Sequence, residues 1–287
     1  MIPWLAAALG LGAPGLALPL YAHDEPCADP RFPAVAGGWL FSCDAQGRVA
    51  QALRLDDGHA VALPVAVEQP AVGPGCIYVP GVNGGLWRLG DGAPEAVSAV
   101  ALVVEPLAAP PVTDCAHIAL LTDNAVQAFA VGDRVRRSVE ARPAGWYPPA
   151  LAWPWVAWIE APRPGERVLM AYNVESGERR AGPGLPGARH VIGRDGLFAW
   201  ADDTQLWLWE PMSQAARATP AEAGFSAPLS LDRGVICYEE RQAGHLDLRC
   251  TDGLAVQGPG HQRAPQRSGD RLLYREDDRL MLYTAPR

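Results

Sequence analysis

Lysine is absent from the chain: all 24 basic residues are arginine, and with 32 acidic residues the formal net charge is −8. The absence excludes a phosphate-binding loop of the G-x-x-x-x-G-K-[ST] type, because that motif uses a lysine to bind the phosphates. A protein that binds nucleic acid through its charge carries an excess of basic residues, not of acidic ones. The charge therefore argues against a nucleic-acid partner.

Recognisable catalytic motifs are also missing. None of the six histidines belongs to an H-E-x-x-H pair or another paired metal-binding spacing. No G-x-S-x-G sequence occurs, and the nearest, Gly-Phe-Ser-Ala-Pro at residues 224–228, lacks the final glycine. No two cysteines are spaced as C-x-x-C, so a zinc or thioredoxin-type site loses its usual support. The sequence indicates no cofactor, and His117, inside an apolar strand, is interpreted as structural.

Long helices are not expected either. The 30 glycines and 28 prolines make up about one residue in five, against about 12% in average proteins. No ten-residue segment beyond the first 22 residues shows convincing helical periodicity. Hydrophobic residues account for 49% of the chain, which is enough for a packed globular protein and argues against disorder.

Charged residues do not occur in residues 2–22, which contain a run rich in Leu, Ala and Gly. This segment is typical of a secretory signal peptide, and the residues near Ala22 predict cleavage after that alanine. The alternative is an uncleaved membrane anchor, although Pro14 and Pro19 interrupt the run and its length is marginal for a span. We therefore expect a signal peptide at residues 1–22, a single domain at residues 23–287, and a periplasmic or secreted protein with no membrane span after the leader is removed.

The mature chain would keep all six cysteines. An even number of cysteines behind an export signal favours disulfides. Cys237 is expected to pair with Cys250, because the two would lie on neighbouring strands of one hairpin. The remaining pairs would be Cys27–Cys43 and Cys76–Cys115. The alternative is a set of buried free thiols.

A weak repeat organises the chain: a turn, an apolar strand, a polar turn and a second apolar strand. The first strands of the seven units lie at residues 39–43, 76–80, 117–121, 155–159, 197–201, 235–239 and 272–276. Their starts are 37, 41, 38, 42, 38 and 37 residues apart. The second strands lie at residues 52–55, 86–89, 126–131, 167–172, 205–209, 245–250 and 279–284.

Short strands at a period near 40 residues are typical of a propeller with four-stranded blades. Several of the strands are apolar at nearly every position, which fits sheets that neighbouring blades cover on both faces. We expect an all-β, seven-bladed β-propeller, with six or eight blades as alternatives and a two-sheet sandwich as the rival fold. The seventh unit lacks one strand, so we expect an N-terminal strand from residues 23–31 to close the ring.

Three turn-plus-strand segments, at residues 193–201, 231–240 and 267–276, resemble the Ser-Pro-Asp-Gly-x-x-Ile-Ala-Phe repeat of TolB-type bacterial propellers. The other four units resemble it only in outline, and the Ser-Pro dipeptide is absent from all seven. The resemblance implies a periplasmic or secreted protein that binds protein or ligand partners at a face of the ring. It implies no particular site residue.

The candidate partner-binding residues lie in loops and turns. Trp146 and Tyr147 precede two prolines between the third and fourth units, at a position that a propeller places at the mouth of its channel. Most of the ten tryptophans fall inside strands, where packing between blades explains them. His190 and His261 are further candidates, and a carboxylate beside either histidine would instead favour an enzyme.

Acidic residues recur in the turns between the first and second strands, which a propeller places on the same face as the connections between blades. They are Asp44, Asp123, Glu160, Glu166, Asp202, Asp203, Glu239, Glu240, Glu276, Asp277 and Asp278. Such a rim could attract a basic partner or hold calcium weakly. The simpler interpretation is that aspartate is favoured in hairpin turns. Asp202, Asp203, Asp277 and Asp278 are the residues whose neutralisation would distinguish the two.

These observations favour an exported, non-catalytic propeller that acts as a binding or scaffold platform for a protein or surface polymer. One alternative is a polysaccharide lyase or glycoside hydrolase, in which carboxylates from different blades converge at the channel mouth. Another is a structural subunit of a cell-surface assembly. No cofactor is predicted, and calcium is the one ion left open.

Overall fold

Short apolar strands fill the part of the chain that the computed structural model describes. That part comprises residues 17–22, 35–36, 39–43, 49–54, 60–67, 71–73, 76–80, 86–89, 95–98, 107–132, 136–144, 147–183, 188–202, 204–221, 229–242, 244–277 and 279–284. These residues form 28 strands. Among them there is no helix long and apolar enough to cross a membrane.

The strands form six hydrogen-bonded sheets, five of four strands and one of eight. The first sheet contains β2 (Val35–Ala36), β3 (Trp39–Cys43), β4 (Val49–Arg54) and β5 (Ala60–Val67). The eight-stranded sheet contains β6 (Ala71–Gly73), β7 (Cys76–Pro80), β8 (Leu86–Leu89), β9 (Glu95–Ser98), β10 (Leu107–Thr113), β11 (His117–Thr122), β12 (Ala125–Ala130) and β13 (Arg137–Glu140).

The remaining four sheets have four strands each. Two of them contain β14 (Ala150–Ala152), β15 (Trp155–Glu160), β16 (Val168–Asn173) and β17 (Arg179–Ala181), and β18 (Arg189–Arg194), β19 (Leu197–Ala201), β20 (Gln205–Glu210) and β21 (Ala215–Pro220). The next contains β22 (Ser230–Asp232), β23 (Val235–Gln242), β24 (His245–Cys250) and β25 (Ala255–Val256). The last contains β26 (Gln262–Ser268), β27 (Arg271–Glu276), β28 (Arg279–Thr284) and β1 (Ala17–Ala22).

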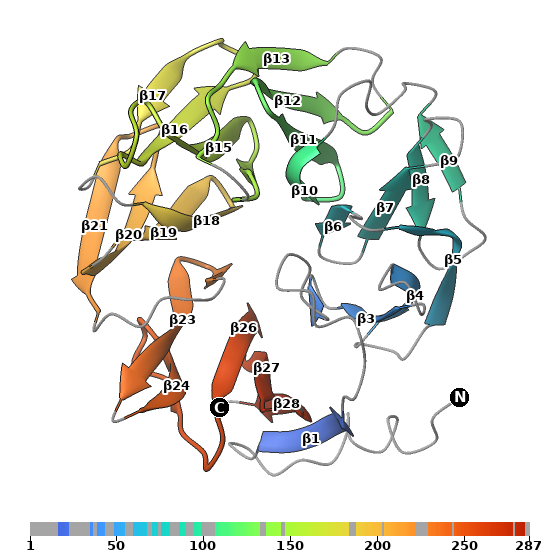
Figure 1. Ribbon diagram of the computed structural model, residues 1–287, viewed down its shortest axis with the longest axis vertical. Coiled ribbons are helices and arrows are strands. Elements are labelled where there is room, and N and C mark those ends of the chain that lie inside the picture. Colours follow the sequence, from blue (N-terminus) through green and yellow to red (C-terminus); the bar gives the residue numbers. More distant parts are fainter. Residues whose placement is uncertain are drawn as a thin grey trace.

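Within these sheets, strands that follow one another along the chain pair side by side and antiparallel. The eight-stranded sheet is two such sets of four, joined by one parallel pairing between Val72 in β6 and Val112 in β10. Figure 1 shows the sheets following one another around a common centre, with β6, β10, β18 and β26 nearest the centre and β9, β13, β17 and β21 on the outside. The predicted all-β repeat architecture is thereby confirmed.

The fourteen strands predicted from the sequence all exist, and their bounds agree to within three residues. The predicted first strands are β3, β7, β11, β15, β19, β23 and β27, and the predicted second strands are the strands that follow each of them. The apolar repeat found these strands because they are the two central strands of each sheet and are covered on both faces. The sequence signal was weaker for the innermost and outermost strands.

The outer strand of the last sheet differs from the prediction. The sequence places it within residues 23–31, whereas the strand that pairs with β28 is β1, with Ala17 opposite Tyr283 and Ala22 opposite Arg279. Residues 23–31 contain two prolines and four charged residues, whereas β1 contains one proline and no charged residue. Because aspartate and proline are depleted in strands, the uncharged segment is the better strand former, although residues 23–34 themselves lie outside the described part.

Aromatic side chains form much of the core between neighbouring sheets. In β15, Trp155 packs in a cluster with Phe198 and Trp200 of β19, while Trp158 packs in a cluster with residues of β11 and β12. Trp155, Trp158 and Trp200 are each at most 3% exposed. One strand therefore contributes to two separate cores, which explains why its sequence is apolar at nearly every position.

Two of the three predicted disulfides are confirmed. Cys237 and Cys250 face each other across β23 and β24 and are bonded, and Cys76 is bonded to Cys115. Cys27 and the side chain of Cys43 lie outside the described part, so the third pair stays a prediction. The two observed disulfides are consistent with an exported or periplasmic protein.

Candidate functional site

The antiparallel sheets present two sets of loops on opposite faces. We call the first the connection face: it lies at the strand ends where β14, β18, β22 and β26 begin and where the two central strands of each sheet meet. The second, the turn face, lies at the opposite strand ends, where the innermost strand of each sheet meets a central strand and where the other central strand meets the outermost strand. Because each strand reverses the chain direction, the two sets lie at opposite strand ends. The predicted site residues that the structure describes, Tyr147, His190, Asp202, His261 and Asp277, belong to the connection face.

Tyr147 and His190 come together on the connection face, although they are 43 positions apart in the sequence. Tyr147 precedes β14, His190 lies at the start of β18, and their rings meet edge to face with centroids 5.8 Å apart. The Nη1 atom of Arg167 donates a hydrogen bond of 2.6 Å to the Tyr147 hydroxyl. All three side chains are partly exposed. Trp146 lies outside the described part.

His261 and Asp277 also come together on this face. The backbone N–H of His261 donates to Asp277 Oδ1 at 3.0 Å, and the backbone N–H of Asp277 donates to the His261 carbonyl at 3.0 Å. The His261 Nδ1 atom accepts a hydrogen bond from the backbone N–H of Leu246, and the His245 ring lies 5.6 Å away. A ring whose Nδ1 accepts carries its proton on Nε2 when neutral. Asp278 lies outside the described part.

The Asp202 carboxylate accepts hydrogen bonds from its own turn and stabilises that turn. It is 2% exposed, and its Oδ1 accepts from the backbone N–H groups of Thr204 and Gln205 at 2.8 Å. Its Oδ2 accepts from Trp207 Nε1 at 2.7 Å. Burial raises the pKa of this carboxyl, but the hydrogen bonds from Thr204, Trp207 and Gln205 outweigh burial and hold the pKa below its ordinary value. Asp202 thus has almost no surface to offer a partner, and Asp203 lies outside the described part.

Of the other acids predicted for the rim, some are buried or paired within the protein, as Asp202 is, and others are exposed. Glu239 and Glu240 are 3% and 8% exposed, and Glu160 forms an ion pair with Arg179 at 2.5 Å. Asp123 and Asp277 are exposed. Within the described part of the chain, no three His, Cys, Asp or Glu side chains gather as a metal site would require. Several rim acids therefore stabilise turns or pair locally, as the simpler interpretation of these residues expects.

Nothing in the sequence pattern pointed to Arg167, which bonds the Tyr147 hydroxyl. It precedes β16 in a polar turn, where one arginine resembles any other. His117, interpreted as structural, stacks on Trp153 with ring centroids 3.7 Å apart and bonds Asp114 through Nδ1 at 3.0 Å. That contact lies on the turn face, away from the predicted site.

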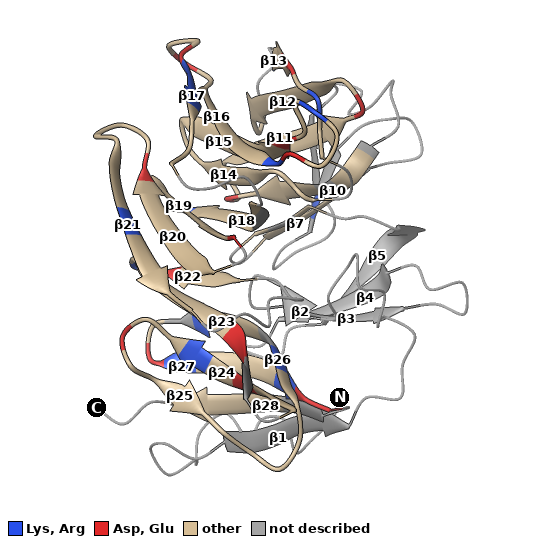
Figure 2. Cartoon of the chain, turned by 60° about the vertical axis from the view of Figure 1, so that its left-hand side comes forward, with Lys and Arg blue, Asp and Glu red and all other residues tan. Residues whose placement is uncertain are grey.

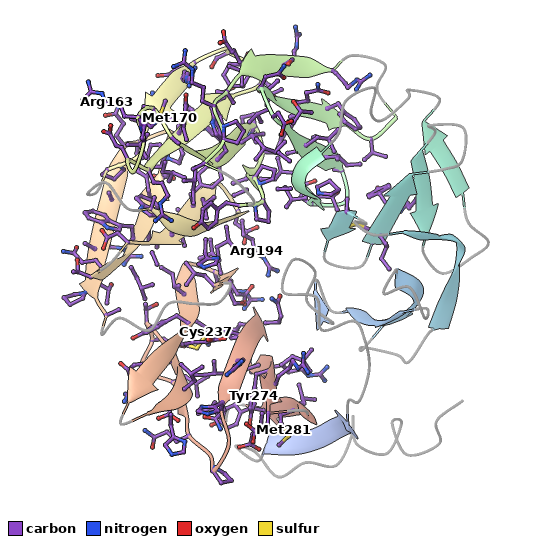
Figure 3. The ribbon with its side chains drawn as sticks, viewed as in Figure 1. Arg163, Met170, Arg194, Cys237, Tyr274 and Met281 are labelled. Atoms are coloured by element: carbon purple, nitrogen blue, oxygen red, sulfur yellow. A yellow bond between two sulfur atoms is a disulfide. The ribbon has the colours of Figure 1, made fainter. Side chains whose placement is uncertain are left out.

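A network of charged residues on the turn face was also not predicted. It links β18, β22 and β26, the inner strands of three successive sheets. Arg194 Nη1 contacts Asp232 Oδ1 at 3.2 Å, and Asp232 Oδ2 accepts from the backbone N–H of Gly269 at 2.8 Å. Figure 3 shows Arg194 near the centre around which the sheets are arranged. These contacts connect sheets far apart in sequence, so only the fold reveals them.

The turns on this face follow the repeat that suggested TolB-type propellers. Asp195 and Gly196 have φ values of 52° and 78°, and Arg233 and Gly234 have values of 49° and 76°. Two consecutive residues with positive φ are typical of a type I′ hairpin turn, which favours Asp-Gly sequences. Arg233 therefore has the positive φ that Asp195 has at the equivalent position of the preceding sheet.

Comparison with known proteins gives the fold but no family. No protein-family model and no curated protein matches the chain. Among solved structures, the β-propeller domain of the Trilobed protease from Pyrococcus furiosus has a TM-score of 0.57 at 9% identity, covering 85% of this chain and 87% of that one. A virginiamycin B lyase from Staphylococcus aureus has a TM-score of 0.55 at 12% identity, covering 94% and 99%.

A third solved structure is a puromycin-hydrolyzing peptidase from Mycobacterium tuberculosis. It has a TM-score of 0.56 at 16% identity, covering 92% of this chain but 52% of that one. This chain thus spans about half the length of the peptidase. At these identities the likeness concerns the fold alone, and the chain has a β-propeller repeat fold.

Proposed function

We propose that this chain is an exported, non-catalytic propeller of the TolB type whose connection face binds a protein or surface-polymer partner. The contact of Tyr147 with His190 and Arg167 carries this proposal. It brings an aromatic ring, an imidazole and a guanidinium from two sheets together, partly exposed, on the face where propellers hold their connecting loops. Tyrosine and arginine are enriched in protein interfaces, because they combine apolar contact area with hydrogen bonding.

The proposed ring has seven blades. Five sheets of four strands each count as one blade, and the eight-stranded sheet counts as two, because its halves are joined by a single pairing between Val72 and Val112. The pairing of β1 with β28 would close this ring and leave β28 without an exposed edge. Such closure removes a site for unwanted pairing with other chains.

If β1 closes the ring, the signal peptide cannot extend to Ala22, because cleavage after Ala22 would remove β1. We therefore place the processing site of the exported protein upstream of Ala17. The intact mass of protein recovered from the cell envelope or the medium should correspond to a chain that still contains residues 17–22. A mass that begins at His23 would contradict this placement, and another segment would then have to pair with β28.

Capture experiments test the proposed platform. The tagged wild-type protein should retain a stoichiometric partner from the native envelope, and a Tyr147→Ala variant should lose most of it. The alanine removes the ring that contacts His190 and the hydroxyl that Arg167 bonds. An interface residue of this kind costs about 2 kcal/mol or more when truncated, a loss of about thirtyfold in affinity.

The matched control is Tyr172→Phe, which changes a partly exposed tyrosine of β16 and keeps its ring. This control should capture as much partner as the wild type and melt at the wild-type temperature. Because Tyr147 also packs against the core that contains Trp155 and Trp200, Tyr147→Ala should melt at a lower temperature, and capture is compared at a temperature where all three proteins are folded. Equal capture by Tyr147→Ala and wild type would exclude this part of the connection face. Recovery only within a large insoluble assembly would instead favour the structural-subunit alternative.

An enzyme is the second candidate, because a carboxylate does lie beside His261. The contact, however, joins the carboxylate of Asp277 to the backbone N–H of His261, and the imidazole Nδ1 accepts from Leu246. This arrangement does not form an acid–base pair between the carboxylate and the ring. The likeness to a virginiamycin B lyase at 12% identity concerns the fold. The platform is therefore the better supported function.

A further inference from the structure

A depression of about 480 Å³ lies on the turn face between the last two sheets. It is lined by Asp232, Arg233, Val235, Arg267, Gly269 and Asp270. The strand β26 is seven residues long and separates this depression from His261 on the connection face by about 20 Å, at about 3.3 Å per residue. The volume is within the range of pockets for small ligands. The depression is thus distinct from the proposed platform.

Asp232, which lines the depression, and Asp252, which pairs with the lining Arg267, are both held in ion pairs within the protein. Asp232 is 4% exposed and accepts from Arg194 through one oxygen and from Gly269 through the other. Asp252 accepts from Arg267 Nη1 at 2.7 Å. Asp232 and Asp252 therefore contribute little uncompensated negative charge, whereas Asp270 is an exposed carboxylate of the lining.

Two arginines line the depression, Arg233 and Arg267, of which Arg267 is 14% exposed and already paired with Asp252. Arg233 is exposed, and among the described residues it has no ion-pair partner. The described contacts of Arg267 use its Nε and Nη1 atoms, the former toward the Gly269 carbonyl at 3.1 Å, which leaves Nη2 for a ligand. A guanidinium presents paired N–H groups that match the oxygens of a carboxylate or phosphate.

The backbone next to these arginines also leaves room for a ligand. Gly269 has a φ of 61°, and a Cβ atom placed there would meet no atom within 4 Å. Val235 supplies an apolar wall on the other side. Figure 2 shows basic residues on β26 and β27 of a chain whose net charge is −8. The depression thus brings two guanidinium groups, Arg233 and Arg267, together beside an apolar wall, with two carboxylates, Asp232 and Asp270, in the same lining.

We propose that this depression binds a small ligand through a carboxylate or phosphate group, held by Arg233 and the Nη2 atom of Arg267. The ligand oxygens accept from the two guanidinium groups, and the carbon skeleton lies against Val235. Binding weakens as salt rises, because Arg233 is exposed and its charge is screened. This site is independent of a partner on the connection face.

Titration calorimetry of the whole protein with citrate and with inorganic phosphate tests the site. Either probe should bind saturably at millimolar or lower concentration. Arg233→Asn should weaken binding about tenfold or more, the loss of one charge-assisted hydrogen bond. Asparagine suits this position, because it tolerates a positive φ better than most residues. Arg233→Lys keeps the charge but loses the paired N–H groups of the guanidinium, so its affinity should fall between those of the wild type and Arg233→Asn.

The matched control is Arg217→Asn, which removes an exposed arginine from β21 and should bind as the wild type does. Amide NMR shifts of the wild type, followed at Gly234 and Gly269, locate the probe without any substitution. If a hexaglutamate peptide competes with citrate, the ligand's carboxylate group belongs to an acidic peptide. If the peptide does not compete, the ligand is a free small anion.

Two results would overturn the proposal: no saturable binding of either probe, or unchanged binding by Arg233→Asn. Neither result affects the platform, because Tyr147→Ala should keep citrate binding and Arg233→Asn should keep partner capture. The two sites are therefore tested separately.

Discussion

Replacing Trp200 by alanine is expected to lower the free energy of unfolding by about 3–5 kcal/mol. Trp200 is 1% exposed, stacks on Trp207 with centroids 5.9 Å apart and meets Trp209 edge to face at 6.2 Å. It belongs to the core between the sheets of β15 and β19, so its loss leaves a cavity between two sheets. Urea unfolding followed by circular dichroism measures the change, and the melting temperature should fall by about 5–10 °C.

The control for this substitution is Met212→Ala. Met212 is 70% exposed, so removing its side chain should change the unfolding free energy by less than about 0.5 kcal/mol. A cost below about 1 kcal/mol for Trp200→Ala would mean that the two sheets do not share the close-packed core described above.

Removing the Cys76–Cys115 disulfide should have an effect of similar size. The bond links β7 in one half of the eight-stranded sheet to the turn before β11 in the other half, across 39 positions. Loop-closure entropy in the unfolded chain gives a stabilisation of about 4 kcal/mol for a loop of this length. The hydrogen bond that the Tyr78 hydroxyl donates to the Cys115 carbonyl, 2.5 Å long, would also be weakened.

The double variant Cys76→Ala, Cys115→Ala tests this by urea unfolding under oxidising conditions. The matched control, Cys237→Ala with Cys250→Ala, removes a bond that spans 13 positions within one hairpin. This control should lower the free energy of unfolding by less, about 3 kcal/mol. Unchanged stability in the Cys76 and Cys115 variant would contradict the role of this bond in joining the two halves of the sheet.

The strands were predictable because a repeated physical constraint acts on them. Trp155 and Ile159 face one core while Val156 and Trp158 face another, so such strands are apolar on both faces and stand out at a period near 40 residues. The outer strand β1 was placed too late in the chain. It pairs at one edge of its sheet only, and a strand with one partner imposes a weaker pattern on its sequence.

The site was less predictable, because its contacts join different sheets. The sequence indicates Tyr147 by its position in a connecting loop and His190 only as a histidine without a metal-binding spacing, and nothing in it indicates that Arg167 contacts Tyr147. Asp202 was singled out for its charge, yet its carboxylate is used by the backbone of its own turn. The pairing of Arg194 with Asp232 depends on the register of neighbouring sheets, which a single sequence does not contain.

Crosslinking from position 147 would show whether a partner binds at the connection face. A photoreactive phenylalanine analogue would replace Tyr147, and a matched probe would replace Met212, an exposed residue on the turn face. After illumination of intact cells, the probe at position 147 should yield one dominant crosslinked partner, and the probe at position 212 should not. Equal crosslinking from both positions, or none from position 147, would contradict a partner-binding role of the connection face.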